Sequence, residues 1–165
     1  MYGAGRGKTT LVDIGLLIEG EMKDEVVEIE DLTLKGGGNS GLSANWGMNV
    51  IMRGCTVEDC QENGLIAWKA DVSCVDLQVV GCGMSGVFAY GTSIHGNVTK
   101  GDSMNYGLNA IRRTVDCNSS EPKIKLVAPL TKEQISTNNG GGGNWNGDKS
   151  YIPESDHVTI EQVSK

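Results

Sequence analysis

Apolar and polar residues follow a repeated pattern along most of this chain. Four segments begin with glycine and continue with an aliphatic residue, a variable residue and alanine. They start at Gly41, Gly64, Gly86 and Gly107, a repeat of about 22 residues. A period of this length indicates that one structural unit is stacked several times.

A second apolar segment precedes the glycine in each repeat. Ile29–Leu34 aligns with Met52–Val57 and with Cys74–Val79, and a weaker copy ends at Lys100. Apolar residues alternate with polar ones, which is typical of a strand with one buried face. Three columns are predicted to point inward. One is alanine throughout, one holds Leu42, Leu65, Val87 and Leu108, and one in the preceding segment holds Leu32, Cys55, Leu77 and Val98.

These features predict an all-β fold. Short strands separated by Gly, Asn and Asp favour a three-sided coil of parallel strands, in which one turn cannot bury its apolar face alone. A leucine-rich repeat is rejected because its leucine and asparagine pattern is absent. We therefore expect a single-stranded right-handed parallel β-helix, a solenoid of about 5–6 rungs forming one domain over residues 1–165.

The C-terminal third departs from the repeat. Regular rungs are expected over about residues 10–112. Residues 113–155 are expected to form a long excursion that contains a mobile glycine-rich loop around Gly140–Gly143. A final rung strand is expected at 156–163, where Asp156 would take the position of Asn49. Long excursions in compact domains are often functional.

Two segments resemble a known group of proteins. Gly3–Leu11 resembles a coil opening of the pectin/pectate-lyase-like superfamily of right-handed β-helices, and Val27–Leu34 with its glycine-rich turn resembles a rung. The resemblance implies the fold but no single activity, because the superfamily includes lyases, hydrolases, epimerases, esterases, phage tail proteins and noncatalytic scaffolds. The signature motifs of polygalacturonases, pectin esterases and alginate epimerases are absent, so no catalytic residue is transferred.

Charge and hydropathy limit the classes of binding partner that we expect. The net charge is −7 and the 14 basic residues are scattered, which argues against nucleic acid and anionic membrane as partners. There is no 18-residue apolar run and no visible signal peptide. We expect a soluble protein, cytoplasmic or within a larger assembly, although Met1 could mark an N-terminal truncation.

The glycine-rich start does not indicate nucleotide binding. Gly7-Lys8-Thr9 matches the end of a phosphate-binding loop, but the first glycine of that motif is replaced by Tyr2. A turn leading into a strand at Thr10–Ile14 fits better.

The five cysteines include no CxxC pair, and neither histidine has ligand spacing, so no metal site is expected. Cys60 and Cys82 occupy the same repeat position one rung apart. Adjacent strands lie roughly 5 Å apart, so these residues could form a disulfide, but two reduced, stacked thiols are favoured.

One polar cluster could support acid–base chemistry. It contains Asp76, His95, Lys100 and Asp102, and it would suit a polysaccharide lyase or epimerase acting on an acidic polysaccharide, with Ca²⁺ as a cofactor under that alternative alone. Asp31 shares a corner position with Asp76, and Asp59 shares one with Asp102, but each pair is roughly 10 Å apart. Solvated corner acids explain these residues more simply.

The outward positions are unusually apolar. A solvated sheet face should be polar, whereas the central rungs place five large apolar residues side by side. We call this set the aromatic face; it comprises Ile66, Trp68, Phe88, Tyr90 and Ile111.

The aromatic face could bind a protein partner or stack on a glycan, or the chain's own segment 123–130 could cover it. Trp145 in the glycine-rich loop could act as a lid, a docking residue or an anchor in the core. We favour a noncatalytic scaffold or binding module, with the carbohydrate-active enzyme as the alternative.

Overall fold

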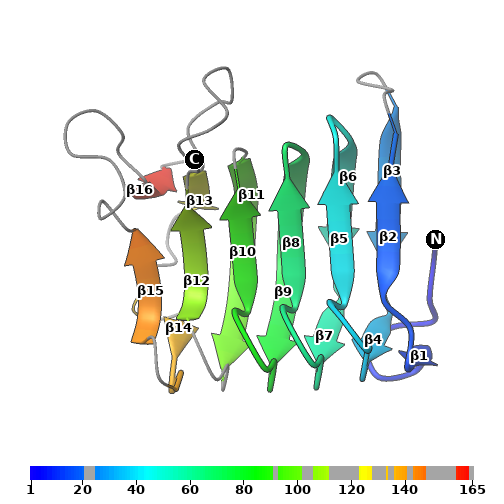
Figure 1. The fold of residues 1–165 in the computed structure, drawn as a ribbon. Helices are drawn as coiled ribbons and strands as arrows, with labels where there is room; N and C mark the ends of the chain where they lie inside the picture. The colour runs from blue at the N-terminus through cyan, green and yellow to red at the C-terminus, as the bar shows by residue number, and fades with distance from the viewer. Residues whose placement is uncertain are drawn as a thin grey trace.

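A computed structural model describes residues 1–20, 25–90, 93–101, 106–111, 123–127, 133, 136–140, 143–147 and 159–163. The chain is an all-β protein whose parallel strands stack as a β-solenoid (Figure 1). Residues 25–90, which are described without a gap, make about three turns. The predicted fold class is therefore confirmed.

One side of the solenoid is a six-stranded parallel sheet, drawn at the front of Figure 1. Each turn contributes one short strand to it. In spatial order the strands are β2 (Leu16–Glu19), β5 (Leu42–Asn45), β8 (Leu65–Trp68), β10 (Val87–Tyr90), β12 (Tyr106–Ile111) and β15 (Gly143–Gly147).

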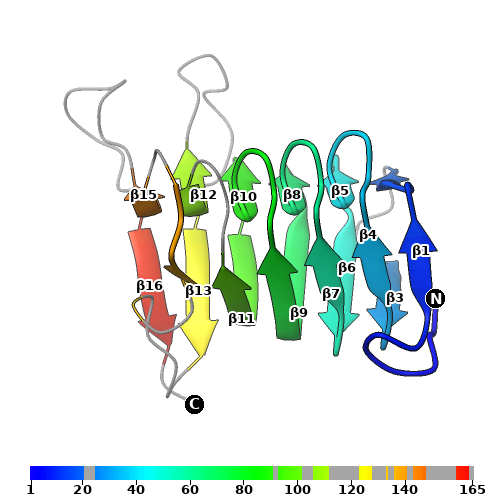
Figure 2. The same ribbon diagram turned by 90° about the horizontal axis from the view of Figure 1, so that it is seen from below.

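A ten-stranded sheet forms the other two sides (Figure 2). Most turns contribute two strands to it, but β9 and β11 run through the corner and serve both sides. The strands are β1 (Thr10–Val12), β3 (Val26–Glu30), β4 (Thr33–Lys35), β6 (Asn49–Arg53), β7 (Thr56–Glu58), β9 (Asp71–Val80), β11 (Ser93–Gly101), β13 (Lys123–Val127), β14 (Ser136–Thr137) and β16 (Thr159–Val163).

The strand register confirms the columns predicted from the repeat. Leu42, Leu65, Val87 and Leu108 pair in sequence across four strands, and all four are 0% exposed. The alanine column is in register beside them. Because every turn repeats these residues, each turn closes the core of its neighbour.

The repeated glycine is required by packing. A Cβ on Gly41 would lie 2.3 Å from Cγ1 of Val57, and a Cβ on Gly64 would lie 2.3 Å from Cγ1 of Val79. Neither glycine has a positive φ. The main chain at this position lies directly against the core valines, so any side chain would displace them.

The corners contain a different glycine pattern, in which aspartate and glycine alternate from turn to turn. Asp31, Gly54 and Asp76 stack at one corner with φ of 56°, 59° and 54°. A second corner repeats the alternation through Asp13, Gly36, Asp59 and Gly81. Glycine and, less often, aspartate adopt this left-handed conformation, so the corner acids have a backbone role.

The structure revises the excursion expected over 113–155. Three strands, β13, β14 and β15, lie within that range and pair in parallel with β11 and β12. The alternating residues of β13 allow this, because Ile124 joins an inward column and is 0% exposed. The solenoid therefore continues past Arg112.

The last strand is also shifted from its expected place. The sequence matched Asp156 to Asn49 and Asp71, but β16 places Thr159 in line with Lys123, which occupies that position in its own turn. Residues 156–158 lie outside the described part of the chain. The shift of three residues places Ile160 level with Ile124 in the strand register.

Candidate binding surface

The aromatic face lies on the outer side of the six-stranded sheet. The inward residues of β8, Leu65 and Ala67, are buried, while the alternate residues Ile66 and Trp68 are half-buried. Phe88 pairs in register with Ile66 and is also half-buried. These side chains come from adjacent parallel strands, which lie roughly 5 Å apart, so they form one continuous patch.

The remaining members of the aromatic face are placed by backbone register. Tyr90 pairs with Trp68 on one side and with Ile111 on the other. Asn45 precedes Trp68 in this column, and Asn109 follows Phe88 in the neighbouring one. Asn45 therefore borders the apolar patch in one column, and Asn109 borders it in the other.

The segment expected to cover this surface lies elsewhere. Residues 123–127 form β13, which pairs with β11 and β16 in the ten-stranded sheet. Figure 2 shows β13 between these two strands, on a different side of the solenoid from β8 and β10. Residues 128–130 are outside the described residues. The described part of the tail does not cover the aromatic face.

Trp145 belongs to the core side of the sheet and not to the aromatic face. It pairs with Leu108 in β15 and packs, partly buried, against the hydrophobic core. This corrects the expectation of a lid or docking residue and agrees with an anchor in the core. The repeat was hard to detect here because Asn144 replaces the glycine and Gly147 replaces the alanine.

An exposed tryptophan borders the aromatic face. Trp46 is 53% exposed, has a φ of 57°, and lies at the corner after β5. The ammonium of Lys69, at the same corner one turn later, lies 5.1 Å from the centroid of the Trp46 ring. This cation–π contact holds one face of the exposed Trp46 ring against Lys69.

Of the two acids in the predicted catalytic cluster, Asp76 lies within the described residues, and its side chain forms an ion pair. Its Oδ2 lies 3.1 Å from Nη2 of Arg6, and the same nitrogen donates to the main-chain oxygen of Asp76. Asp76 is at a corner, with its side chain 60% exposed. Sequence reasoning missed Arg6, since no local pattern indicates a contact across 70 residues.

The register does not bring the other cluster members into one column. His95 pairs with Ser73, which is half-buried, on one side of the solenoid. Lys100 pairs with Val79 on the next side, in a column that also holds the buried residues Leu34 and Val57. Asp102 lies outside the described residues. The backbone register therefore places His95 and Lys100 on different sides of the solenoid.

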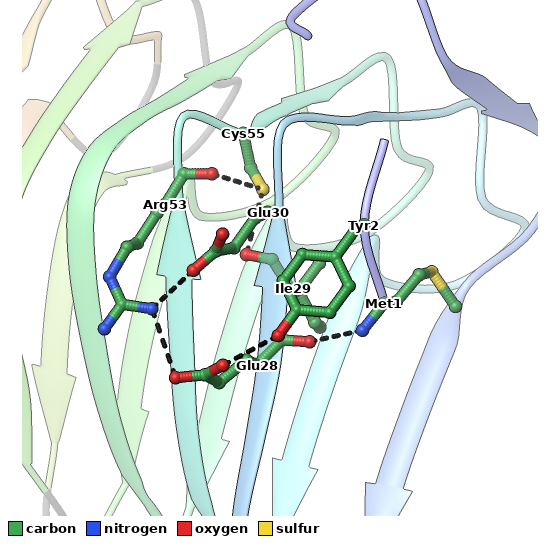
Figure 3. A network of polar contacts seen from close by, with 7 residues as sticks. All are labelled: Met1, Tyr2, Glu28, Ile29, Glu30, Arg53 and Cys55. Atoms are coloured by element: carbon green, nitrogen blue, oxygen red, sulfur yellow. Dashed lines mark hydrogen bonds and ion pairs between the residues drawn. The ribbon is translucent and has the colours of Figure 1, made fainter. Parts of the chain in front are cut away.

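The best-defined polar network lies at the N-terminal end (Figure 3). The Tyr2 hydroxyl donates to Oε2 of Glu28 at 2.9 Å, and Nη1 of Arg53 donates to Oε1 of Glu30 at 2.6 Å and to Oε1 of Glu28 at 3.4 Å. The hydrogen bonds from Tyr2 and Arg53 lower the pKa of Glu28, and its carboxylate raises the pKa of Tyr2. Exposed pairs of this kind stabilise a fold only slightly.

The cysteines within the described residues are buried and form no disulfide; they are Cys55, Cys60, Cys74 and Cys82. A hydrogen bond with Cys82 lowers the pKa of the Cys60 thiol, consistent with the predicted stacking of two thiols. Burial raises the pKa of Cys74 to about 12. No group of three His, Cys, Asp or Glu in the described residues could hold a metal ion.

In the part of the chain that the structure describes, no helix is long and apolar enough to cross a membrane. The sequence matches no protein-family model, and neither the curated proteins nor the solved structures contain a similar chain.

Proposed function

We propose that this protein is a noncatalytic β-solenoid that presents the aromatic face to a binding partner. The observation that carries the proposal is the position of three large side chains on the outer side of the sheet, all partly exposed: Ile66 and Trp68 on β8, and Phe88 on β10 in register with Ile66. A sheet face that met only water would be polar at these positions.

A protein partner suits this surface better than a glycan. Aromatic and branched aliphatic side chains are mixed across it, and buried aromatic anchors dominate protein interfaces. A glycan site would use the same rings but needs polar groups beside them to bind hydroxyls. Asn45 borders the aromatic face and donates to Oε1 of Glu19 at 3.0 Å, so glycan binding is the second candidate.

The test compares tryptophans that differ in position. Trp68→Ala should remove binding to a partner isolated with the wild-type protein, while Trp46→Ala should leave it nearly unchanged. Phe88→Ala should weaken binding in the same way as Trp68→Ala. A polysaccharide panel tested with the same variants separates the glycan from the protein outcome. Equal binding by wild type and Trp68→Ala would overturn the proposal.

The enzymatic alternative has less support. A lyase or epimerase needs a base close to the proton that it abstracts and a cation or basic group that neutralises the uronate. Asp76 is paired with Arg6, and the register positions of His95 and Lys100 lie on different sides. Release of unsaturated uronates from an acidic polysaccharide by the wild type, but not by His95→Ala, would replace our proposal with this one.

We also propose that the chain is a divergent right-handed β-helix of the pectin/pectate-lyase-like superfamily. The turn of about 22 residues, the three strands per turn and the Gly3–Leu11 opening support this assignment. An experimental structure that shows a left-handed coil would overturn it.

A further inference from the structure

Cys60 and Cys82 lie in equivalent connections of adjacent turns. Cys60 is in the connection from β7 to β8, and Cys82 is in the connection from β9 to β10, which runs beside it (Figure 2). The Asp59 amide donates to the Val80 carbonyl at 3.0 Å. The Gly83 amide donates to the Cys60 carbonyl at 2.8 Å. The parallel pairing of β7 with β9 therefore continues through the corner and places Cys60 opposite Cys82.

The two thiols have the same position in their turns. Sγ of Cys60 lies 3.7 Å from the carbonyl oxygen of Glu58. Sγ of Cys82 lies 3.7 Å from the carbonyl oxygen of Val80, and a hydrogen bond joins the two thiols. Adjacent strands lie roughly 5 Å apart, and disulfides join Cα atoms separated by about 4.4–6.8 Å. The two sulfur atoms can therefore be linked without a large movement of the main chain.

The surroundings of Cys60 favour it as the thiol that reacts first. Its neighbours in sequence, Asp59 and Gln61, are exposed, whereas Cys60 itself is 2% exposed. It thus lies directly beneath the corner, and a local opening there is enough to admit a small oxidant. Nζ of Lys35 lies 2.9 Å from Oε1 of Glu58 and 3.1 Å from Oδ2 of Asp59. This ammonium offsets the two carboxylates that oppose a thiolate at Cys60.

The other two described cysteines lack this arrangement. In the part of the chain that the structure describes, neither Cys55 nor Cys74 has a cysteine opposite it on a neighbouring strand. Burial also raises the pKa of the Cys74 thiol to about 12, so this thiol stays protonated and unreactive. Oxidation is therefore expected to select the pair at the corner.

We propose that Cys60 and Cys82 form a redox-sensitive pair that closes into a disulfide when the protein meets a peroxide. The Cys60 thiolate attacks one oxygen of hydrogen peroxide and breaks the O–O bond, which gives a sulfenic acid and a hydroxide that takes up the thiol proton as water. The sulfur of Cys82 then attacks the sulfenic sulfur. Its S–H bond and the S–OH bond break, and a second water leaves. Two thiols are thus oxidised while one peroxide is reduced to two waters.

The disulfide links the two turns that carry β8 and β10. Each cysteine comes shortly before one of these strands, so the cross-link joins the supports of the aromatic face. It closes a loop of about 22 residues, which restricts the unfolded chain and raises the stability of the folded one. The cross-link forms whether or not the aromatic face binds a partner, so this proposal does not depend on the proposed function.

Counting thiols after oxidation of the folded protein tests the proposal. The reduced protein is treated with a small molar excess of hydrogen peroxide, unfolded, alkylated with iodoacetamide and weighed by mass spectrometry. The wild type should lose two of its five thiols, and dithiothreitol should restore both. Cys60→Ala and Cys82→Ala should form no disulfide within the chain. Cys55→Ala is the matched control and should still lose two thiols.

Peptide mapping of the wild type identifies the pair even if a variant fails to fold. Cleavage after glutamate and after large apolar residues places Cys60 and Cys82 in separate peptides that hold no other cysteine, and these peptides should be the linked ones. The oxidised wild type should also melt at a higher temperature than the reduced protein, and Cys82→Ala should show no such difference. A wild type that keeps all five thiols, a disulfide between other cysteines, or oxidation to sulfinic acid without a disulfide would overturn the proposal.

Discussion

The carboxylate of Asp31 occupies the space beside Gly54 on the following turn. A Cβ on Gly54 would lie 2.5 Å from Oδ1 of Asp31. The same relationship joins Asp59 to Gly81, with 2.7 Å between the corresponding atoms. In both pairs the carboxylate of one turn fills the space that a side chain on the next turn would need, so glycine is required at Gly54 and Gly81.

Gly54→Ala should lower the free energy of unfolding by about 1–3 kcal/mol, because the added Cβ meets Asp31 and the residue has a φ of 59°. Gly38→Ala is the control, since no atom lies within 4 Å of its added Cβ and its φ is not positive. Urea denaturation measures both. A Gly54→Ala protein as stable as Gly38→Ala would show that the corner tolerates a side chain.

Gly64→Ala should destabilise the core by an amount typical of overpacking, about 1–3 kcal/mol. The added Cβ would lie 2.3 Å from Cγ1 of Val79 and 2.6 Å from the carbonyl oxygen of Gly86. Val79→Ala in the same chain should not restore full stability, because the main-chain contact remains. Thermal unfolding of the single and double variants tests this, and a fully restored melting temperature would contradict the main-chain argument.

Replacing two of the buried cysteines with serine should lower the free energy of unfolding by different amounts. Cys55 Sγ lies 3.4 Å from the Ile29 carbonyl oxygen and 3.3 Å from that of Arg53, so a hydroxyl there would find acceptors. Cys74 is fully buried, and burial dominates the rise in its pKa. Cys74→Ser should therefore cost about 1–3 kcal/mol more than Cys55→Ser in chemical denaturation. The opposite ranking would be evidence against this environment for Cys74.

The Tyr2–Glu28–Arg53 network should weaken in acid. Hydrogen bonds from Tyr2 and Arg53 lower the folded-state pKa of Glu28 from its ordinary value of 4.5. Its contribution to stability is therefore present above the unfolded pKa and is lost as pH falls through the lower, folded pKa. The Glu30 amide donates to the Met1 carbonyl at 2.9 Å, and its hydrogen exchange should quicken over the same range, relative to the intrinsic rate.

Glu28→Gln should flatten this acid response of the N-terminal segment. Glu25→Gln removes the same charge from an exposed residue outside the network and should leave the response unchanged. If both variants kept the wild-type pH dependence, Glu28 would not be the titrating group.

The fold could be predicted because the same residue types recur at the same positions. The glycine and alanine columns assigned β5, β8, β10 and β12 to one sheet with the register that the structure shows. The apolar columns fix which residues of each strand point inward, because a shift of one residue would turn the whole column to the solvent. The outward positions of the aromatic face followed from the same phase.

The later turns could not be predicted in this way. Trp145 follows Leu108 in its column, but the connection between them is longer than in earlier turns and the marker residues change. The role of Asp76 was also missed, because its partner Arg6 comes from the first loop. Contacts between distant segments leave no periodic signal in the sequence.

The loop that holds Gly5 and Arg6 changes how this solenoid is expected to unfold from its N-terminal turn. In an ideal stack each unit depends only on its immediate neighbours, so the end unit can fray alone. The Gly5 amide donates to the Asp31 carbonyl, and Arg6 passes the turn that holds Gly54 to reach Asp76. Release of the terminal segment therefore removes a contact from a turn that it does not touch through its strands. Fraying of the terminal segment should therefore also loosen the corner at Asp76.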